Sequence, residues 1–253
     1  MISTEGLILK EQSVGENDKL VTILTSSHGI IRCFCKRAKK LISKTSSACQ
    51  AMTYSRLEIY EGREKYIINE AETIKSFFDA FSDLESLSLG YYLCEIAMKT
   101  IPENMPSDEY LQLLLNCLYA ISIKKKPLAQ IKAVFELRTM LLNGVVPNIL
   151  FCNECGTYES DNGIMYFDYA NNCIYCAKCC SKNLLAPHCL AVSMGCITAT
   201  RYCITAEPKR ILSFDLLPSS MADLEKFSES FFLSQNDMHY STLDFYKNIK
   251  QLN

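Results

Sequence analysis

Four cysteines stand in two pairs of the form Cys-x-x-Cys, Cys152 with Cys155 and Cys176 with Cys179, and twenty residues separate the inner members. Each pair forms a turn that brings two thiolates to one ion, and two such turns supply the four sulfurs of a tetrahedral zinc site. Because four thiolates leave no position for water or substrate, we expect a structural Zn²⁺ rather than a catalytic one. The overlapping pair Cys173-x-x-Cys176 leaves open whether Cys173 replaces Cys176 as a ligand.

A second candidate site is a basic stretch near the start of the chain. No acidic residue occurs between Lys19 and Leu57, whereas the same stretch holds eight lysines and arginines. A loop of this charge can neutralise successive nucleic-acid phosphates, and aromatic residues such as Phe34 or Tyr60 offer faces on which unpaired bases stack. A solvated basic loop over core aromatics is the alternative. The predicted phosphate contacts are Arg32, Lys36, Arg37, Lys39, Lys40 and Lys44.

Length and composition limit the class of protein. A chain of 253 residues is long enough for two or three domains. It holds no run of eighteen apolar residues, and its first residues lack the basic and apolar regions of a signal peptide. We therefore expect a cytoplasmic protein with no membrane partner, in which most of the fourteen cysteines are reduced.

Residues 1–80 have the pattern of a small β domain. Short runs rich in β-branched and aromatic residues alternate with turn signals, and none of the intervening segments has a helical period long enough for a crossover. This favours an antiparallel barrel, with an OB-like barrel as the leading candidate. The predicted strands are 6–10, 20–24, 30–35, 56–60 and 65–68.

The apolar period changes to three to four residues after residue 82. Helices are predicted over about 84–98, 107–118 and 127–143, and again at about 188–205, 220–233 and 243–249. The cysteine segment interrupts this pattern. The expected fold is therefore an α+β multidomain chain: an OB-like nucleic-acid-binding barrel at 1–80, a helical domain formed by 81–150 and 186–253, and an inserted zinc knuckle with four cysteine ligands at 151–185.

Motifs of common enzyme classes do not occur in the sequence. It contains no Gly-rich phosphate loop, no Gly-x-Ser-x-Gly elbow and no His-Glu-x-x-His pair. The acidic residues around 103–109 lie at a turn and a helix start, where stabilisation of the helix dipole explains them. We therefore expect a protein without catalytic residues and without enzymatic activity.

Taken in order, several short segments resemble the bacterial DNA repair protein RecO family. They are Thr4 to Leu9, Gly15 to Thr22, His28-Gly29, Tyr60 to Arg63, Phe135 to Arg138, the stretch from Gly144 to Pro147 that leads into Cys152-x-x-Cys155-Gly156, and Ser241 to Tyr246. The resemblance spans nearly the whole chain. Arg37 stands where relatives often have a small glycine, and Gln50-Ala51 where they often have Gln-Pro, so the individual DNA contacts do not carry over.

The resemblance implies a function in recombination. A member of this family is a mediator that binds single- and double-stranded DNA, anneals complementary strands and, with RecR, helps to load RecA onto strands coated by single-strand binding protein (SSB). RecF is a further candidate partner, and the location would be cytoplasmic and associated with the nucleoid. For the acidic, apolar C-terminal tail of SSB we predict a site on the helix at 127–143, with Lys132 and Arg138 as its cations.

Two other function classes remain open from the residues alone. A zinc-ribbon adaptor would bind proteins through its helical domain and have no direct DNA role. A thiol-redox enzyme or zinc hydrolase would need an open ligand position or a reactive Cys-x-x-Cys pair. A salt titration with single-stranded DNA separates the first class from a DNA-binding mediator, and zinc content after mild oxidation tests the second.

Overall fold

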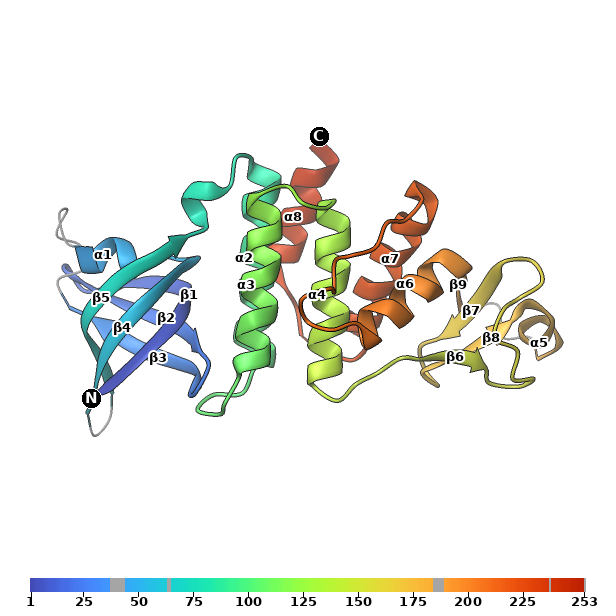
Figure 1. Cartoon of the computed structure of the whole chain (residues 1–253), viewed down its shortest axis with the longest axis horizontal. Helices are drawn as coiled ribbons and strands as arrows, with labels where there is room; N and C mark the ends of the chain where they lie inside the picture. The colour runs from blue at the N-terminus through green and yellow to red at the C-terminus, as the bar shows by residue number, and fades with distance from the viewer. Residues whose placement is uncertain (37–43, 63–64, 184–188, 237, 253) are drawn as a thin grey trace. The chain divides into compact units, whose positions relative to one another are not determined.

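The structure, a computed structural model, describes residues 1–36, 44–62, 65–183, 189–236 and 238–252 (Figure 1). Its N-terminal part is a closed barrel with the strand order β1-β2-β3-β5-β4, in which β4 also pairs with β1. The strands are β1 (Ile2–Val14), β2 (Asp18–Thr25), β3 (Gly29–Cys35), β4 (Thr53–Glu61) and β5 (Tyr66–Ser76), and a short helix, α1 (Lys44–Ala48), lies between β3 and β4. The predicted OB-like barrel is confirmed.

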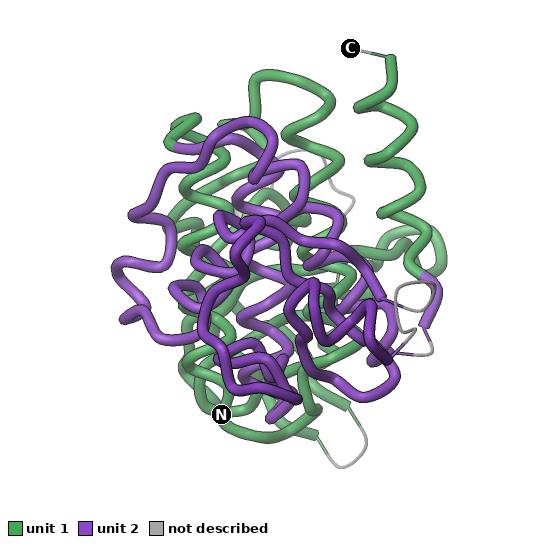
Figure 2. The backbone as a smooth tube through the Cα atoms, turned by 90° about the vertical axis from the view of Figure 1, so that its right-hand side faces the viewer, with its two compact units in different colours: residues 1–125, 240–253 green, residues 126–239 purple. Residues whose placement is uncertain are grey.

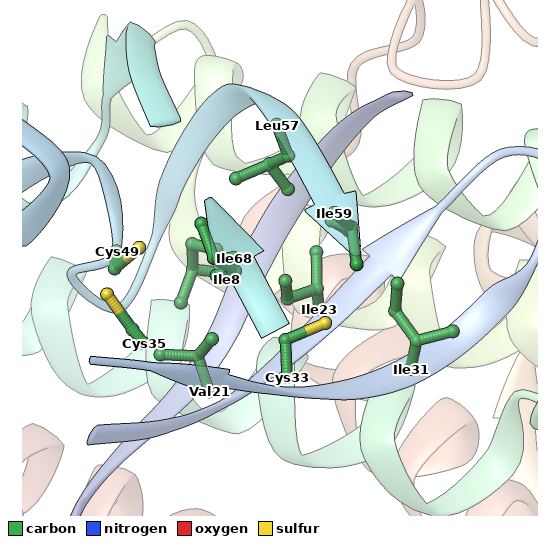
Figure 3. Close-up of a cluster of buried hydrophobic side chains, with 10 residues drawn as sticks. All are labelled: Ile8, Val21, Ile23, Ile31, Cys33, Cys35, Cys49, Leu57, Ile59 and Ile68. Atoms are coloured by element: carbon green, nitrogen blue, oxygen red, sulfur yellow. The ribbon is translucent and has the colours of Figure 1, made fainter. Parts of the chain in front are cut away.

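Alternating side chains explain why these segments close around a common core. Along β3, Ile31, Cys33 and Cys35 point inward and are at most 2% exposed, whereas Arg32 and Phe34 point outward. Figure 3 shows the inward side chains of several strands meeting inside the barrel. A β-bulge near Ile8 and two in the β4–β5 pair let the long strands bend enough to close.

The chain divides into two compact units, coloured separately in Figure 2. The first comprises residues 1–125 and 240–253, and the second comprises residues 126–239. The three-part domain division predicted above stays a prediction. In the structure, the helices assigned there to one helical domain fall in both units.

Three helices accompany the barrel in the first unit, after a single turn of 3₁₀ helix at Phe78–Ala80. They are α2 (Leu84–Thr100), α3 (Asp108–Ser122) and α8 (Ser241–Leu252), and α2 packs against both others. Asp83 caps α2 by accepting a hydrogen bond from the backbone N–H of Ser86 at 2.7 Å, and this bond lowers the pKa of Asp83 to about 2. Buried Cys94 and Cys117 lie on the apolar faces of α2 and α3.

The second unit contains helices and a four-stranded sheet. Its helices are α4 (Leu128–Leu142), α5 (Ala177–Lys182), α6 (Met194–Thr205) and α7 (Pro218–Ser234), and α4 packs against α6 and α7. The sheet has the order β6-β8-β7-β9, with β6 (Asn148–Cys152), β7 (Ile164–Asp168), β8 (Cys173–Cys176) and β9 (Cys189–Ser193).

One predicted helix was wrong in its first part. Residues 189–193 of the helix expected at about 188–205 form β9, which pairs antiparallel with β7 from Ile164↔Ser193 to Asp168↔Cys189. The helix starts at Met194, where the side chain of Ser193 accepts a hydrogen bond from the backbone N–H of Cys196. A short apolar run is compatible with both the helical and the strand periodicity, and here pairing with β7 makes it a strand.

Among the described residues, no helix combines the length and the apolar character needed to cross a membrane.

Candidate functional site

The outer face of β2, β3 and β5 presents aromatic, apolar and basic side chains together. Phe34 on β3 lies beside Leu20 on β2 and beside Ile67 on β5, and all three side chains are partly exposed. These three side chains form a small, partly exposed apolar patch on the outer face of the barrel, which makes this face a candidate contact surface. A shallow groove follows it, and we call this the barrel groove. Its lining residues are Leu20, Ile30, Ile31, Arg32, Phe34, Glu61, Gly62, Lys65, Tyr66, Glu103 and Asn104.

Cations, carboxylates and aromatic rings lie together in the barrel groove. The Lys65 Nζ lies 5.5 Å from the centre of the Phe34 ring. Arg32 is two residues before Phe34 on the same strand face, and 64% of its side chain is exposed. Tyr66 also lines the groove and donates a hydrogen bond to Glu61 at 3.3 Å. This arrangement offers ring faces for bases and cations for phosphates, as in proteins that bind single strands.

The structure describes only part of the predicted phosphate-binding set. Arg32 lies in the barrel groove, and Lys36 is exposed directly after the end of β3. Arg37, Lys39 and Lys40 lie outside the described residues. Lys44 begins α1, but its side chain is likewise outside the description.

Sequence reasoning missed Lys65 and Glu103 as members of this surface. Lys65 reaches Phe34 because β5 pairs in parallel with β3, from Cys33↔Tyr66 to Cys35↔Ile68. This pairing joins segments about thirty residues apart in the sequence. It could have been predicted only from the expectation that a five-stranded OB-type barrel closes. Glu103 comes from the connection between α2 and α3, and no local pattern indicates that it meets Arg32 at 2.9 Å.

The second candidate site is the cysteine cluster. The Sγ atoms of Cys152, Cys155, Cys176 and Cys179 all lie within 4.8 Å of one another. The Sγ atoms of Cys155 and Cys176 are 3.8 Å apart, which matches the edge of about 3.8 Å that a tetrahedron with Zn–S bonds of about 2.3 Å requires. The four residues therefore fit a tetrahedral metal ion.

Local backbone geometry builds this cluster. Cys152 ends β6 and Cys176 ends β8, and these two strands pair in parallel, so both residues lie at one end of the sheet. The turn after Cys152 closes with a bond from the N–H of Gly156 to the Cys152 carbonyl at 2.9 Å. Gly156 has φ +71°, which a residue with a side chain rarely adopts. Cys179 follows one turn into α5.

Backbone N–H groups stabilise the thiolate form of Cys152, the form that binds metals. Burial of Cys152 opposes ionisation, but the N–H groups of Cys155, Cys176 and Glu154 donate to its sulfur and lower the pKa of the thiol to about 7. The bond from the Cys176 N–H measures 3.3 Å. A thiolate at neutral pH is the form in which cysteine binds metals.

The other cysteines of the segment stand apart from the cluster. The sulfur cluster includes Cys176 and excludes Cys173, which is 3% exposed and hydrogen-bonds to Tyr175. Cys180 and Cys189 hydrogen-bond to each other. Among the described residues, Cys152, Cys155, Cys176 and Cys179 form the group suited to one ion.

The structure corrects one residue of the predicted partner site. Lys132 is 0% exposed, and its Nζ lies 2.8 Å from Glu136 and 2.9 Å from Glu229, so a partner has no access to it. Burial alone would lower the pKa of Lys132, but the two carboxylates raise it above its usual value and keep the side chain charged. Phe135, three residues further along the same helix, is also in the core.

Arg138, the other predicted partner contact, also has a structural role. Its Nη1 donates to the carbonyl oxygens of Cys203, Ile204 and Ala206 at 3.1 to 3.3 Å. These carbonyls lie at the C-terminal end of α6. Carbonyls in the last turn of a helix have no N–H partner within the helix, so Arg138 caps α6 by donating to them. Arg138 as a whole is partly exposed.

Comparison with known proteins identifies the family of the chain. The family model "Recombination protein O N terminal" matches residues 1–77, and "Recombination protein O C terminal" matches residues 81–237. The chain is 30% identical to DNA repair protein RecO of Acetivibrio thermocellus over 99% of this chain and 98% of that protein. It is 23% identical to DNA repair protein RecO of Alkaliphilus metalliredigens over 98% and 100% of the two chains, and 28% identical to that of Caldicellulosiruptor saccharolyticus over 72% and 73%. The chain belongs to the RecO family, and its role is in DNA repair and recombination.

Proposed function

We propose that the chain is a recombination mediator that binds single-stranded DNA across the barrel groove and makes or breaks no covalent bond. The observation that carries this is the combination of Arg32, Phe34 and Lys65 on one exposed barrel face. A strand lying there would stack bases on Phe34 and place phosphates against Arg32 and Lys65. From β3 the chain continues through Lys36 into the segment with Arg37, Lys39, Lys40 and Lys44, which would extend the phosphate contacts.

Binding of this kind is independent of base sequence. Phosphates carry no sequence information, and stacking on an aromatic ring tolerates every base. The same cations can hold double-stranded DNA by its backbone. Strand annealing is part of the proposed activity and rests on membership of the RecO family.

Salt dependence tests the proposal. If roughly four to six phosphates are neutralised, the logarithm of the affinity for single-stranded DNA falls with the logarithm of the salt concentration at a slope of about −3 to −4. Changing Lys36, Arg37, Lys39 and Lys40 together to alanine should remove most of this slope and most of the annealing activity. Fluorescence anisotropy with a labelled oligonucleotide at several salt concentrations measures the affinity and therefore the slope.

The matched control removes four lysines from the second unit. Lys178, Lys182, Lys209 and Lys226 are exposed, and their replacement by alanine changes the net charge by the same amount. This control should keep the wild-type slope. Equal losses in both variants would mean that net charge alone drives binding, and an unchanged slope in the first variant would move the DNA site elsewhere and favour an adaptor without a direct DNA role.

We further propose that Cys152, Cys155, Cys176 and Cys179 hold one Zn²⁺. The ion would join the ends of β6 and β8 to α5 and so stabilise a sheet of short strands. Its four sulfur ligands leave no position for a substrate, so this chemistry is structural. The chain's own contribution is to supply the thiolates and the N–H groups that hydrogen-bond to Cys152.

The proposed partners follow from family membership. They are RecR, RecF and the C-terminal tail of SSB, with loading of RecA as the outcome. For the SSB tail, Arg138 stays a proposed contact, whereas Lys132 does not.

Arg138→Glu should weaken binding of a tail peptide more than the exposed control Arg210→Glu does. DNA binding and thermal unfolding are measured alongside, because Arg138 also caps α6. Equal peptide affinity in both variants excludes Arg138.

A further inference from the structure

An acidic side chain is held at one end of the barrel groove by the connection between α2 and α3. In this connection the Pro102 carbonyl accepts a hydrogen bond from the N–H of Ile30 at 3.4 Å, and the Ser107 N–H donates to the Ser26 carbonyl at 2.7 Å. Glu103, between these two points, forms backbone bridges with Gly29 and Ile30. The connection therefore crosses the turn between β2 and β3 and is attached to it on both sides of Glu103.

Gly29 permits this close approach. Its φ is +59°, and a Cβ there would stand 2.5 Å from the Met105 carbonyl oxygen and 2.6 Å from that of Pro102. Backbone atoms cannot move aside as a flexible side chain can, so this packing requires glycine. The position of Glu103 is consequently fixed by the backbone rather than by its own side-chain contacts.

The carboxylate of Glu103 is directed at a cation of the barrel groove. Its Oε1 lies 2.9 Å from Nη2 of Arg32, and more than half of each side chain is exposed. An exposed ion pair of this kind is weak, because water and salt screen it and both side chains lose freedom. A DNA phosphate that reaches Arg32 meets the same guanidinium and can displace the carboxylate.

We propose that Glu103 is a built-in competitor of DNA: it occupies Arg32 in the free protein and repels the strand at this end of the barrel groove. The proposal rests on the proposed binding of single-stranded DNA in this groove. Its consequence is weaker, more rapidly reversible binding than the cations alone would give, because the phosphate must replace a carboxylate that stays nearby. A protein that anneals strands has to release them, and such a residue favours release.

Glu103→Gln tests this. The variant keeps the shape of the side chain and the backbone bridges but loses the charge. At low salt we expect about three- to tenfold tighter binding of an oligodeoxythymidine of about 16 nucleotides, the upper end of the site size of one OB fold. The salt slope should change by less than about 0.7, the amount for one phosphate, because a phosphate reaches Arg32 in both proteins. Dissociation measured by stopped flow should slow by a similar factor.

Glu70→Gln is the matched control, since Glu70 is an exposed carboxylate on β5 that does not line the barrel groove. It changes the net charge equally, and we expect its affinity to stay within about twofold of wild type, as for distant screened charges. If Glu103→Gln raises the affinity for the oligonucleotide no more than Glu70→Gln does, while the wild type binds it, the inference about Glu103 is wrong and the proposed function is unaffected. If the wild type itself binds no single-stranded DNA, the proposed function fails instead.

A double-mutant cycle examines the route through Arg32. In an Arg32→Ala background, the gain in DNA-binding free energy from Glu103→Gln should fall to less than half of its value in the wild type. The reason is that the Arg32 guanidinium, for which Glu103 and DNA compete, is then absent. Thermal unfolding of all four proteins verifies that the fold is kept. A full gain in the Arg32→Ala background would overturn the competition for Arg32.

Discussion

Replacing Lys132 by methionine lowers the free energy of unfolding by about 3 to 5 kcal/mol, the usual cost of breaking a buried ion pair from one side. Methionine matches the length of the apolar stem, so the loss comes from the missing charge. Glu136 is 0% exposed and would lose its buried cation while it keeps the hydrogen bond from Ser228 at 2.7 Å, whereas Glu229 is 18% exposed and retains access to water. Urea denaturation followed by circular dichroism measures the loss.

A second substitution separates charge from packing. Adding Glu136→Gln to Lys132→Met removes the buried charge and should recover more than half of the lost stability. Lys178→Met is the matched control, because Lys178 forms a pair of similar length, 2.7 Å, with Asp161 on the surface. It should leave the urea midpoint unchanged. An equal loss in Lys178→Met, or no recovery in the double variant, would contradict the role given to Lys132.

Cys152→Ser should abolish the proposed zinc binding and destabilise the second unit. We expect about one equivalent of zinc per chain in the wild type and less than about 0.2 in the variant, because a structural site of four thiolates rarely holds zinc once a ligand is lost. Zinc binding to such sites is worth roughly 10 kcal/mol or more in small peptides, so its loss should melt the sheet formed by β6 to β9. Plasma emission spectrometry gives the metal content, and proteolysis locates the melted segment.

Cys173→Ser is the control that settles the choice of ligands. Cys173 is buried in β8 three residues before Cys176, and its removal should leave about one equivalent of zinc in place. Loss of zinc in Cys173→Ser with retention in Cys176→Ser would show that the ligand set is wrong. Wild-type protein, freshly reduced, with less than about half an equivalent of zinc would contradict the site as a whole.

The sequence predicted those parts of the fold that have a local signal. The barrel strands are short runs rich in β-branched and aromatic residues between turn signals, and the Cys-x-x-Cys turns have a fixed spacing, so both could be predicted without knowledge of the fold. The helix positions from α2 to α4 followed from the apolar period of three to four residues. Residues 189–193 were misread because pairing with β7 overrides a short ambiguous run.

The parts that the sequence did not predict depend on contacts between distant segments. Lys132 and Glu136 are four residues apart, a spacing that is also common on exposed helix faces. The burial of this pair depends on α7, which supplies Glu229 and Ser228 about ninety residues later. Arg138 likewise meets the end of α6, and Glu103 reaches Arg32 only because Gly29 admits the connection from α2 to α3.

The position of bound DNA tests the central claim most directly. An oligonucleotide containing 5-iododeoxyuridine, cross-linked to the full-length protein by ultraviolet light, reports the aromatic side chains that touch its bases. We predict that mass spectrometry finds the cross-links in peptides containing Phe34 or Tyr66, and that Phe34→Leu removes those at residue 34. Cross-links confined to residues 126–239 would contradict the assignment of the barrel groove as the DNA site.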